Sequence, residues 1–379
     1  MTTLKNLIKK ILFFIFIFIF ILSIQITSAS NLNISCESAI VIEQNTGRIL
    51  YSKNIDRKRA MASTTKIMTA IVAIENGHLD DIITISQNAA EIEGSSIYLE
   101  ANEHLTLEEL LYGLMLRSGN DAAYAIAEYI GGGNVEKFIN MMNRKAEEIG
   151  ANNTHFMNPH GLHDKQHYTT AHDLAKITAY AMKNETFKKI ISTKNKTISW
   201  ENHEWNRSLT NKNKMLWNYQ GGNGVKTGYT TDAGKCFVSS AFRNNIQLIA
   251  VVLKSNDIWK DATALLDYGF DHYKPYKVIS KEDYLKSISV IEGTKDRIRT
   301  YSKKDVIIPI RKEEKDKIQV KIVLPEEIQA PVMREQIVGK LEVYVNNEKI
   351  DSTDIYVKDS IQKKSVQNMF EKFINHWVG

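Results

Sequence analysis

The stretch "MASTTKIMTA", residues 61–70, sets a serine one helical turn before a lysine and then continues into apolar residues. Ser63 and Lys66 lie three positions apart, so in a helix they share one face and the lysine amine can reach the serine hydroxyl. A neutral lysine amine at that place can take the proton from a serine nucleophile. The stretch therefore predicts a helix that begins at Ser63 and carries a candidate nucleophile and a candidate base.

The Ser-x-x-Lys spacing alone is a weak signal, because Ser360 and Lys363 near the C-terminus have it too. A helix-capping serine followed by a solvated lysine produces the same pattern without any chemistry. The context at Ser63 differs, since this serine stands at a predicted helix start, where free backbone N–H groups favour developing negative charge. The choice between the two copies depends on further motifs.

Two more polar motifs follow along the chain. The first, "LRSGNDAA", places Ser118 and Asn120 in the break between two predicted helices, where they can point into a cleft; an ordinary helix–helix turn is the alternative. The second, "GVKTGYT", places Lys226, Thr227 and Gly228 where strand-like sequence begins. A lysine and a hydroxyl there can hold a carboxylate, and glycine lets an extended substrate approach the backbone, although an exposed hairpin turn is equally compatible.

The segments between the motifs predict strands around a helical block. Hairpins are expected where apolar, β-branched runs flank the turns at 45–47 and 243–245. Helical periodicity covers four segments, namely 63–76, 106–117 with the capping box Thr106 and Glu109, 121–130, and 134–149. Strands that enclose helices in this way indicate an α/β or α+β core.

The C-terminal part has a different sequence pattern. From about Lys277 charged residues alternate with apolar ones, as in "KIQVKIV" and "KLEVYV", which is typical of a small antiparallel β domain. The final segment gathers one apolar helical stripe, formed by Val366, Met369, Phe370, Phe373, Ile374 and Trp377. We expect an amphipathic helix from about Ser360 to Gly379 in the outer face of the cytoplasmic membrane, with a helix packed on the β domain as the alternative.

The first residues have the form of a secretory signal. Three lysines precede an apolar run from Ile11 to Leu22, which is shorter than the roughly 20 residues of a membrane span. Cleavage is predicted after Ala29, with an uncleaved N-terminal anchor as the alternative. The expected domains are a signal peptide at 1–29, a catalytic domain at 30–275, a β-rich domain at 276–358 and a membrane-associating helix at 359–379.

Composition narrows the function classes. The chain has 379 residues, of which 43% are hydrophobic and 25% charged, as in a globular protein with room for two domains. Three of the five net positive charges lie in the signal segment, so the remaining chain is nearly neutral and nucleic-acid binding is not indicated. Cys36 and Cys236 are too few for a disulfide framework and are expected to be buried thiols.

Jointly, the three motifs resemble those of the penicillin-recognising serine transferases. The stretches "ASTTKIMTA", "LRSGNDAA", "NPHGL", "TTAHDLA" and "GVKTGYTTDAGKCFVSSA" resemble the D-alanyl-D-alanine carboxypeptidases, the low-molecular-mass penicillin-binding proteins. The resemblance runs from Ala39 to Phe270 and continues in kind through the β domain and the tail. It implies an α/β fold of the β-lactamase/DD-peptidase kind, with an antiparallel sheet flanked by helices and an inserted helical subdomain, followed by a small antiparallel all-β domain.

The resemblance also implies a role for each catalytic residue. Ser63 would attack the carbonyl between the two terminal D-alanines of a peptidoglycan stem pentapeptide. Lys66 would be the general base, with a pKa lowered by burial and by Lys226. Ser118 would relay the proton to the leaving amine. Asn120 would orient Lys66 and hold the substrate amide.

Substrate binding is likewise implied by the resemblance. Lys226 and Thr227 would hold the terminal carboxylate, Gly228 would let the substrate approach, and the backbone N–H groups of Ser63 and Tyr229 would form the oxyanion hole. β-Lactam antibiotics would acylate the same serine and leave slowly. No metal or organic cofactor is implied.

One position departs from the family pattern. Relatives commonly carry a carboxylate-binding arginine before the stretch that corresponds to "ALLDYGF", and Ile258 stands there in this chain. Lys260, or a lysine of "TNKNK" at 210–214, could take its place.

Other functions compete with this hypothesis. A β-lactamase or a DD-endopeptidase of the same fold is the nearest alternative, although the Glu-x-x-Leu-Asn loop of class A β-lactamases does not occur between Asp121 and Lys226. A metal hydrolase is suggested by five crowded histidines, namely His155, His160, His163, His167 and His172. Pro159 and Gly161 favour a loop there instead. A non-catalytic β-lactam sensor is the third alternative.

Overall fold

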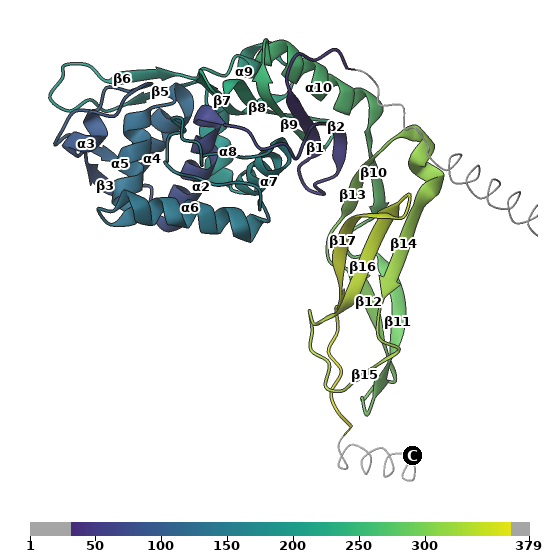
Figure 1. Cartoon of the computed structure of the whole chain (residues 1–379). Coiled ribbons are helices and arrows are strands. Elements are labelled where there is room, and N and C mark those ends of the chain that lie inside the picture. The colour runs from purple at the N-terminus through teal and green to yellow at the C-terminus, as the bar shows by residue number, and fades with distance from the viewer. Residues whose placement is uncertain (1–31, 365–379) are drawn as a thin grey trace, which may run out of the picture. The chain divides into compact units, whose positions relative to one another are not determined.

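The computed structural model describes residues 32–364 (Figure 1). The predicted signal segment and the apolar stripe of the predicted tail helix lie outside the described residues. Among residues 32–364, no helix has the length and apolar character needed to cross a membrane.

A five-stranded antiparallel sheet forms the centre of the catalytic part. Its strands are β1 (Ser38–Glu43), β2 (Ile49–Lys53), β7 (Gly222–Thr230), β8 (Gly234–Arg243) and β9 (Ile246–Ser255), in the order β2-β1-β9-β8-β7. The two predicted hairpins, β1–β2 and β8–β9, are confirmed by their antiparallel registers. β7 stands at one end of this order, so the strand with the "KTG" motif is an edge strand.

Side chains of the sheet point alternately to two different layers. On one face α10 (Ile258–His272) packs so closely that a Cβ on Gly269 would lie 2.5 Å from Leu248 and 3.4 Å from Val41. The neighbours of Val41 in β1, Ile40 and Ile42, belong instead to the large core shared with the helical block. The sheet therefore separates α10 from the helices that carry the first two motifs.

The helical block is inserted between β2 and β7. Its helices are α2 (Lys66–Asn76), α3 (Gln87–Ala90), α4 (Leu107–Tyr112), α5 (Asn120–Gly131), α6 (Val135–Ile149), α7 (Ala171–Ala181), α8 (Glu185–Ser192) and α9 (Met215–Asn218). Two small antiparallel strand pairs accompany them, β3 (Ile82–Thr84) with β4 (His104–Thr106) and the hairpin of β5 (Asn195–Ile198) with β6 (Arg207–Thr210). The predicted capping box of Thr106 and Glu109 is present at α4. Asn134 caps α6, and Gly150 ends it in a left-handed conformation.

Two helix boundaries differ from the prediction. Ser63 does not begin an α-helix but lies in a 3₁₀ turn, η1 (Ala62–Thr65), and α2 starts only at Lys66. The hydroxyls of Thr64 and Thr65 donate to backbone carbonyls three residues back, at 2.6 and 2.8 Å, and such local bonds favour a tighter turn. The helix predicted to reach Arg117 continues beyond α4 as a π-helix, Gly113–Arg117.

A β domain follows α10, as predicted. Its strands are β10 (Lys274–Ile279), β11 (Tyr284–Ile291), β12 (Arg297–Ser302), β13 (Val306–Ile310), β14 (Ile318–Val323), β15 (Glu327–Gln329), β16 (Ile337–Val345) and β17 (Glu348–Val357), with the 3₁₀ helix η3 (Lys312–Lys317) between β13 and β14. β10 pairs with β13, and the other six form one sheet in the order β14-β16-β17-β12-β11-β15. All pairs are antiparallel except β11 with β15.

The start of the predicted tail helix needs a correction. Residues 360–364 are not helical, because Ile361 is buried and forms a β-bridge with Val332. Lys363 bridges Gly293 and pairs with Glu292 at 2.9 Å. An apolar side chain at position 361 fills the core of the β domain, so the chain stays extended there. Any helix in the tail starts after Lys364.

Candidate active site

Ser63 and Lys66 are in direct contact, as their spacing predicts. The Lys66 Nζ donates to the Ser63 Oγ at 3.1 Å. It also donates to the Asn120 Oδ1 and to the His160 carbonyl, both at 2.7 Å. The turn η1 holds the serine and the first residue of α2 supplies the lysine, which is fully buried. All three partners are uncharged, so the ammonium has no counter-ion in direct contact.

This environment lowers the pKa of Lys66 well below its ordinary value. Burial is the main cause because it disfavours the charged form, and the nearby charge of Lys226 acts in the same direction. The Asp121 carboxylate opposes the shift, and Lys212 adds to it. Lys66 therefore has the electrostatic surroundings that a neutral general base needs.

Asn120 is fixed by the loop at 93–99. Its Nδ2 donates to the Glu93 carbonyl at 2.5 Å, and its backbone N–H donates to the Ser95 carbonyl at 2.6 Å. The side-chain oxygen of Asn120 is thereby turned towards Lys66. Asp121 is fully buried and holds the same loop, since its Oδ2 accepts bonds from the Ser96 hydroxyl and from two backbone N–H groups, those of Ile97 and Leu99.

Ser118 ends the π-helix in a left-handed conformation, with φ +67°. It is buried and stands two residues before Asn120, at the junction between the π-helix and α5. The π-bulge that precedes it is a feature often found at functional sites. The structure thus places the second motif at the break between two helices, as predicted; the proton relay itself stays a prediction.

The third motif meets the nucleophile across a narrow gap. A Cβ on Gly228 of β7 would lie 2.9 Å from the backbone nitrogen of Ser63 and 3.1 Å from that of Thr64. Only glycine allows strand and turn to approach so closely. Lys226 is buried, its Nζ donates to the Thr227 carbonyl at 3.0 Å, and burial, followed by the charge of Lys212, lowers the pKa of Lys226 to about 7.

Family comparisons agree with this geometry. Residues 25–257 match the family described as D-alanyl-D-alanine carboxypeptidase, and residues 273–363 match the penicillin-binding protein 5 C-terminal domain. The chain belongs to the D-alanyl-D-alanine carboxypeptidase family. The resemblance inferred from the motifs and the predicted fold class are both confirmed.

Individual relatives of the family cover most of the chain. The D-alanyl-D-alanine carboxypeptidase DacF of Bacillus subtilis is 32% identical and covers 92% of both chains. The D-alanyl-D-alanine carboxypeptidase of Streptomyces sp. strain K15 is 37% identical over 64% of this chain and 90% of its own. The crystal structure of penicillin-binding protein 5 from Haemophilus influenzae has a TM-score of 0.73 at 30% identity and covers 87% of this chain and 98% of that chain.

Lys212 is one of the lysines that could replace the carboxylate-binding arginine, which is absent at Ile258. It belongs to the "TNKNK" stretch, and its Nζ lies 3.4 Å from the Ser95 Oγ. Its charge also contributes to the lowered pKa values of Lys66 and Lys226, in each case after the larger effect of burial. Two buried asparagines shape the turn that displays it, because the backbone N–H of Asn213 donates to the Asn211 Oδ1 at 2.9 Å. Lys212 thus contacts the loop that holds Asn120, while its role towards a substrate carboxylate stays a prediction.

The crowded histidines form a loop that supports the nucleophile. The His167 Nδ1 accepts the backbone N–H of Met157 at 3.0 Å, so its Nε2 carries the proton and donates to the Thr65 Oγ1 at 2.7 Å. A Cβ on Gly161, at φ +90°, would lie 2.0 Å from the Ala62 carbonyl oxygen. Burial, the main cause, lowers the pKa of His167 to about 4.

This loop does not have the arrangement of a metal site. His163 and His167 do not share a helical face, because the segment 161–170 is not helical. Within the part of the chain that the structure describes, no three His, Cys, Asp or Glu side chains gather as metal ligands would. Cys36 and Cys236 are buried free thiols, as predicted. The sequence alone did not reveal that the histidine loop braces the turn of the nucleophile.

Proposed function

We propose that Ser63 and Lys66 perform the family reaction, removal of the terminal D-alanine from a peptidoglycan stem pentapeptide. The contact that carries this proposal is the hydrogen bond between a serine hydroxyl and a fully buried lysine with no carboxylate partner. Burial favours the neutral amine, and the neutral amine can accept the hydroxyl proton.

Acylation follows from this geometry. The Lys66 Nζ takes the proton of Ser63 as the Oγ attacks the carbonyl of the penultimate D-alanine. The negative oxygen that develops lies between the turn η1 and β7, where the backbone N–H groups of Ser63 and Tyr229 serve as donors. The C–N bond then breaks, and the leaving amine receives the proton from Lys66 through the Ser118 hydroxyl. Water later hydrolyses the ester on Ser63.

Recognition of the chain end depends on cations beside β7. Lys226 and Thr227 hold the terminal carboxylate, and Lys212 supplies the positive charge that Ile258 does not. The pKa of Lys226 of about 7 leaves this amine only part charged in the empty site, and a bound carboxylate favours its charged form. A peptide amidated at its C-terminus therefore loses this contact. Benzylpenicillin retains its carboxylate and keeps its amine tethered by the ring, so its acyl-enzyme is long-lived.

Mass spectrometry of the protein after incubation with benzylpenicillin tests the proposal. The expected adduct lies on the peptide that contains Ser63 and is absent in Ser63→Ala. An adduct on Ser118 or Ser360, or no adduct, would overturn the assignment of the nucleophile. Steady, rapid hydrolysis of penicillin would favour the β-lactamase alternative, and equal turnover of an amidated peptide would favour an endopeptidase.

The location of the enzyme is part of the same proposal. The predicted signal would export the chain, and the apolar stripe at 366–377 would hold it on the outer face of the cytoplasmic membrane. The chain ending at Lys364 is the appropriate truncation, because it retains Ile361 in the β domain. Full-length protein is expected to float with anionic liposomes, and the truncated chain to remain soluble with carboxypeptidase activity. Failure of the full-length protein to bind liposomes would contradict the membrane-bound tail.

A further inference from the structure

The loop that braces Asn120 also displays an aromatic ring. The side chain of Tyr98 is 73% exposed, and its backbone is left-handed at φ +61°, which is uncommon for an aromatic residue. The Tyr98 N–H donates to the Ser96 Oγ at 2.7 Å, and its carbonyl accepts the Arg207 Nη2 at 2.6 Å. Its backbone is held in a strained conformation from both sides, which is a feature of functional sites.

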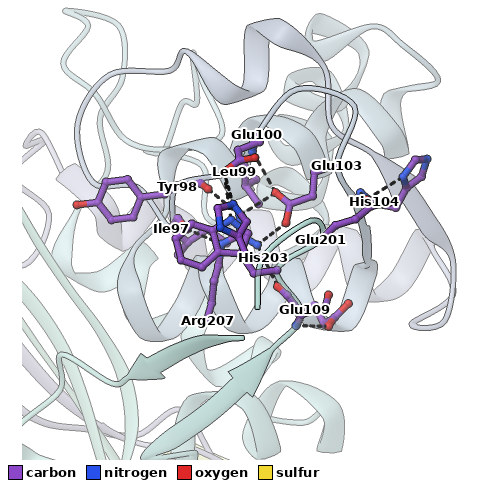
Figure 2. Close-up of polar contacts among 12 residues, drawn as sticks. Ile97, Tyr98, Leu99, Glu100, Glu103, His104, Glu109, Glu201, His203 and Arg207 are labelled. Carbon is purple, nitrogen blue, oxygen red and sulfur yellow. Dashed lines mark hydrogen bonds and ion pairs between the residues drawn. The ribbon is translucent and has the colours of Figure 1, made fainter. Parts of the chain in front are cut away.

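The support for Tyr98 is a buried ionic group. Arg207 pairs with both carboxylate oxygens of Glu103, and its Nη2 lies 2.7 Å from the Glu103 Oε2. The Arg207 Nε donates to the Ile97 carbonyl at 2.9 Å. Figure 2 shows the Tyr98 ring directed away from this cluster, while Arg207 and Glu103 face each other. The buried pair therefore holds the backbone that carries the exposed ring.

The hairpin tip between β5 and β6 adds more aromatic rings. Trp200 stacks on the Arg207 guanidinium at 4.6 Å, and its ring centroid lies 4.1 Å from that of His203. The Trp200 Nε1 donates to the Glu100 Oε1 at 3.3 Å, and the His203 Nε2 lies 2.9 Å from the same oxygen. Trp205, further along the tip, is 62% exposed. The tip is thus fastened to the loop that carries Tyr98.

A pocket of about 180 Å³ lies between the loop and the hairpin. Its lining residues are Ser96, Ile97, Tyr98, Arg117, Trp200, Asn206, Arg207, Ser208 and Leu209. Two lining residues are neighbours in sequence of residues at the site: Arg117 directly precedes Ser118, and Ser96 directly follows Ser95, whose carbonyl accepts the backbone N–H of Asn120. Three successive hydrogen bonds connect the loop to the nucleophile, through Ser95, Asn120, Lys66 and Ser63.

The lining chemistry suits an uncharged sugar. Aromatic rings stack on the C–H face of a pyranose, and the exposed amide of Asn206, the hydroxyl of Ser208 and the guanidinium of Arg117 can bond its hydroxyl and acetamido groups. The Arg207 guanidinium is already paired with Glu103, so its charge is not free to bind an anionic ligand. The four stem residues before the scissile bond span at most about 14 Å, so the proposal requires the sugar to bind within about that distance of Ser63.

We propose that this pocket, which we call the Tyr98 pocket, binds an N-acetylhexosamine ring of the glycan strand that carries the stem peptide. The proposal rests on the proposed function, since it adds a binding site for another part of the same substrate. It makes the enzyme prefer stem peptides that are still attached to glycan. A free peptide lacks the ring and gains nothing from the pocket.

The test compares two substrates, a pentapeptide linked to a disaccharide and the same pentapeptide free. Tyr98→Ala is expected to lower the ratio of their kcat/KM values about fivefold, or about 1 kcal/mol at 1.4 kcal/mol per factor of ten. Tyr98→Phe keeps the ring and is expected to keep the ratio. Tyr284→Ala, which removes an exposed tyrosine of the β domain, is the matched control and leaves the ratio unchanged. An unchanged ratio in Tyr98→Ala would overturn the proposal, whether both rates fall or neither does.

A binding measurement gives a second readout. Titration of the wild-type protein with chitotriose should change the tryptophan emission from Trp200 and Trp205, and Tyr98→Ala should weaken this binding. No change in emission up to millimolar chitotriose would count against the pocket. Acylation of Ser63 by benzylpenicillin separates the two proposals: its loss in the wild type contradicts the proposed function, whereas normal acylation with an unchanged ratio contradicts only the Tyr98 pocket.

Discussion

Two buried cations near the cleft have different surroundings and different chemistry. Lys66 is enclosed by a hydroxyl, an amide oxygen and a backbone carbonyl, whereas Arg207 is enclosed by the Glu103 carboxylate and three backbone carbonyls. A guanidinium cannot lose its proton in a protein, so a buried arginine needs a counter-ion. A lysine without a counter-ion releases its proton instead. The partner, and not burial alone, decides whether a cation holds the fold or performs chemistry.

The largest expected effect comes from Lys66→Ala. Removal of the base should lower the rate of acylation by benzylpenicillin about 10³-fold. The thermal midpoint should change little, because alanine is a good helix former and the buried amine has no ion pair to lose. Mass spectrometry over time and circular dichroism measure the two quantities. Lys137→Ala, at an exposed position of α6, is the control, and wild-type acylation in Lys66→Ala would point to another base.

Glu103→Gln tests the other cation. The change leaves the Arg207 charge buried without its partner, which typically costs about 3–5 kcal/mol. The thermal midpoint should fall by roughly 10 °C. Glu342→Gln, which breaks the exposed pair with Lys349, is the matched control and should leave the midpoint unchanged. A midpoint for Glu103→Gln equal to that of the control would show that the buried pair is not what holds this loop.

The pH dependence of kcat/KM should show the ionisation of both Lys66 and Lys226. The rate should rise with pH as Lys66 loses its proton, and it should fall above about pH 7 as Lys226 loses the charge that binds the carboxylate. The fall should approach roughly tenfold per pH unit, as for one essential proton. A flat profile from pH 6 to 9 would contradict the assigned roles.

The folding stability should also depend on pH through Lys226, and it should rise with pH where kcat/KM falls. The pKa of Lys226 is about 7 in the folded chain and near 10.5 when unfolded, so between these values the unfolded state binds more protons. Lys226 therefore destabilises the fold at low pH, and this penalty diminishes as the pH rises through that window. Lys226→Met should lose the effect, which thermal midpoints at pH 7 and pH 10 would reveal.

The smallest expected effect is a gain from Ile258→Arg. The change restores the arginine that relatives commonly carry at the aligned position, where a substrate carboxylate would supply the counter-ion. KM for a peptide ending in D-Ala-D-Ala should fall about threefold with kcat nearly unchanged, since an exposed charge pair contributes up to about 1 kcal/mol. Ile258→Met, which keeps the volume without the charge, is the control. An equal response of both variants would exclude a carboxylate contact at this position.

Much of the fold could be predicted because its signals are local. The capping box at Thr106 and the glycines that end the helices act within one turn, and the hairpins follow from turns of two or three residues. The 3₁₀ turn at Ser63 was missed because its cause includes contacts from far along the chain, such as that of His167 with Thr65. Periodicity does not show such contacts.

The site could be predicted only in part for a related reason. Motif spacing identified Ser63, Lys66 and Asn120, and the structure joins them by hydrogen bonds. It did not single out Lys212, whose place depends on how a distant turn folds back. The tail showed the opposite error: the stripe suggested a helix from Ser360, but Ile361 is buried in the β domain, which a pattern of spacing cannot reveal.

The position of β7 at the end of the sheet has a wider consequence. An edge strand offers unpaired main-chain groups, and an extended peptide can join it as one more strand. Pairing of this kind binds the main chain of the peptide and depends little on its side chains. If the stem peptide pairs with this edge, we expect the enzyme to accept peptides that differ in their third residue, because walls built from different diamino acids share the same main chain.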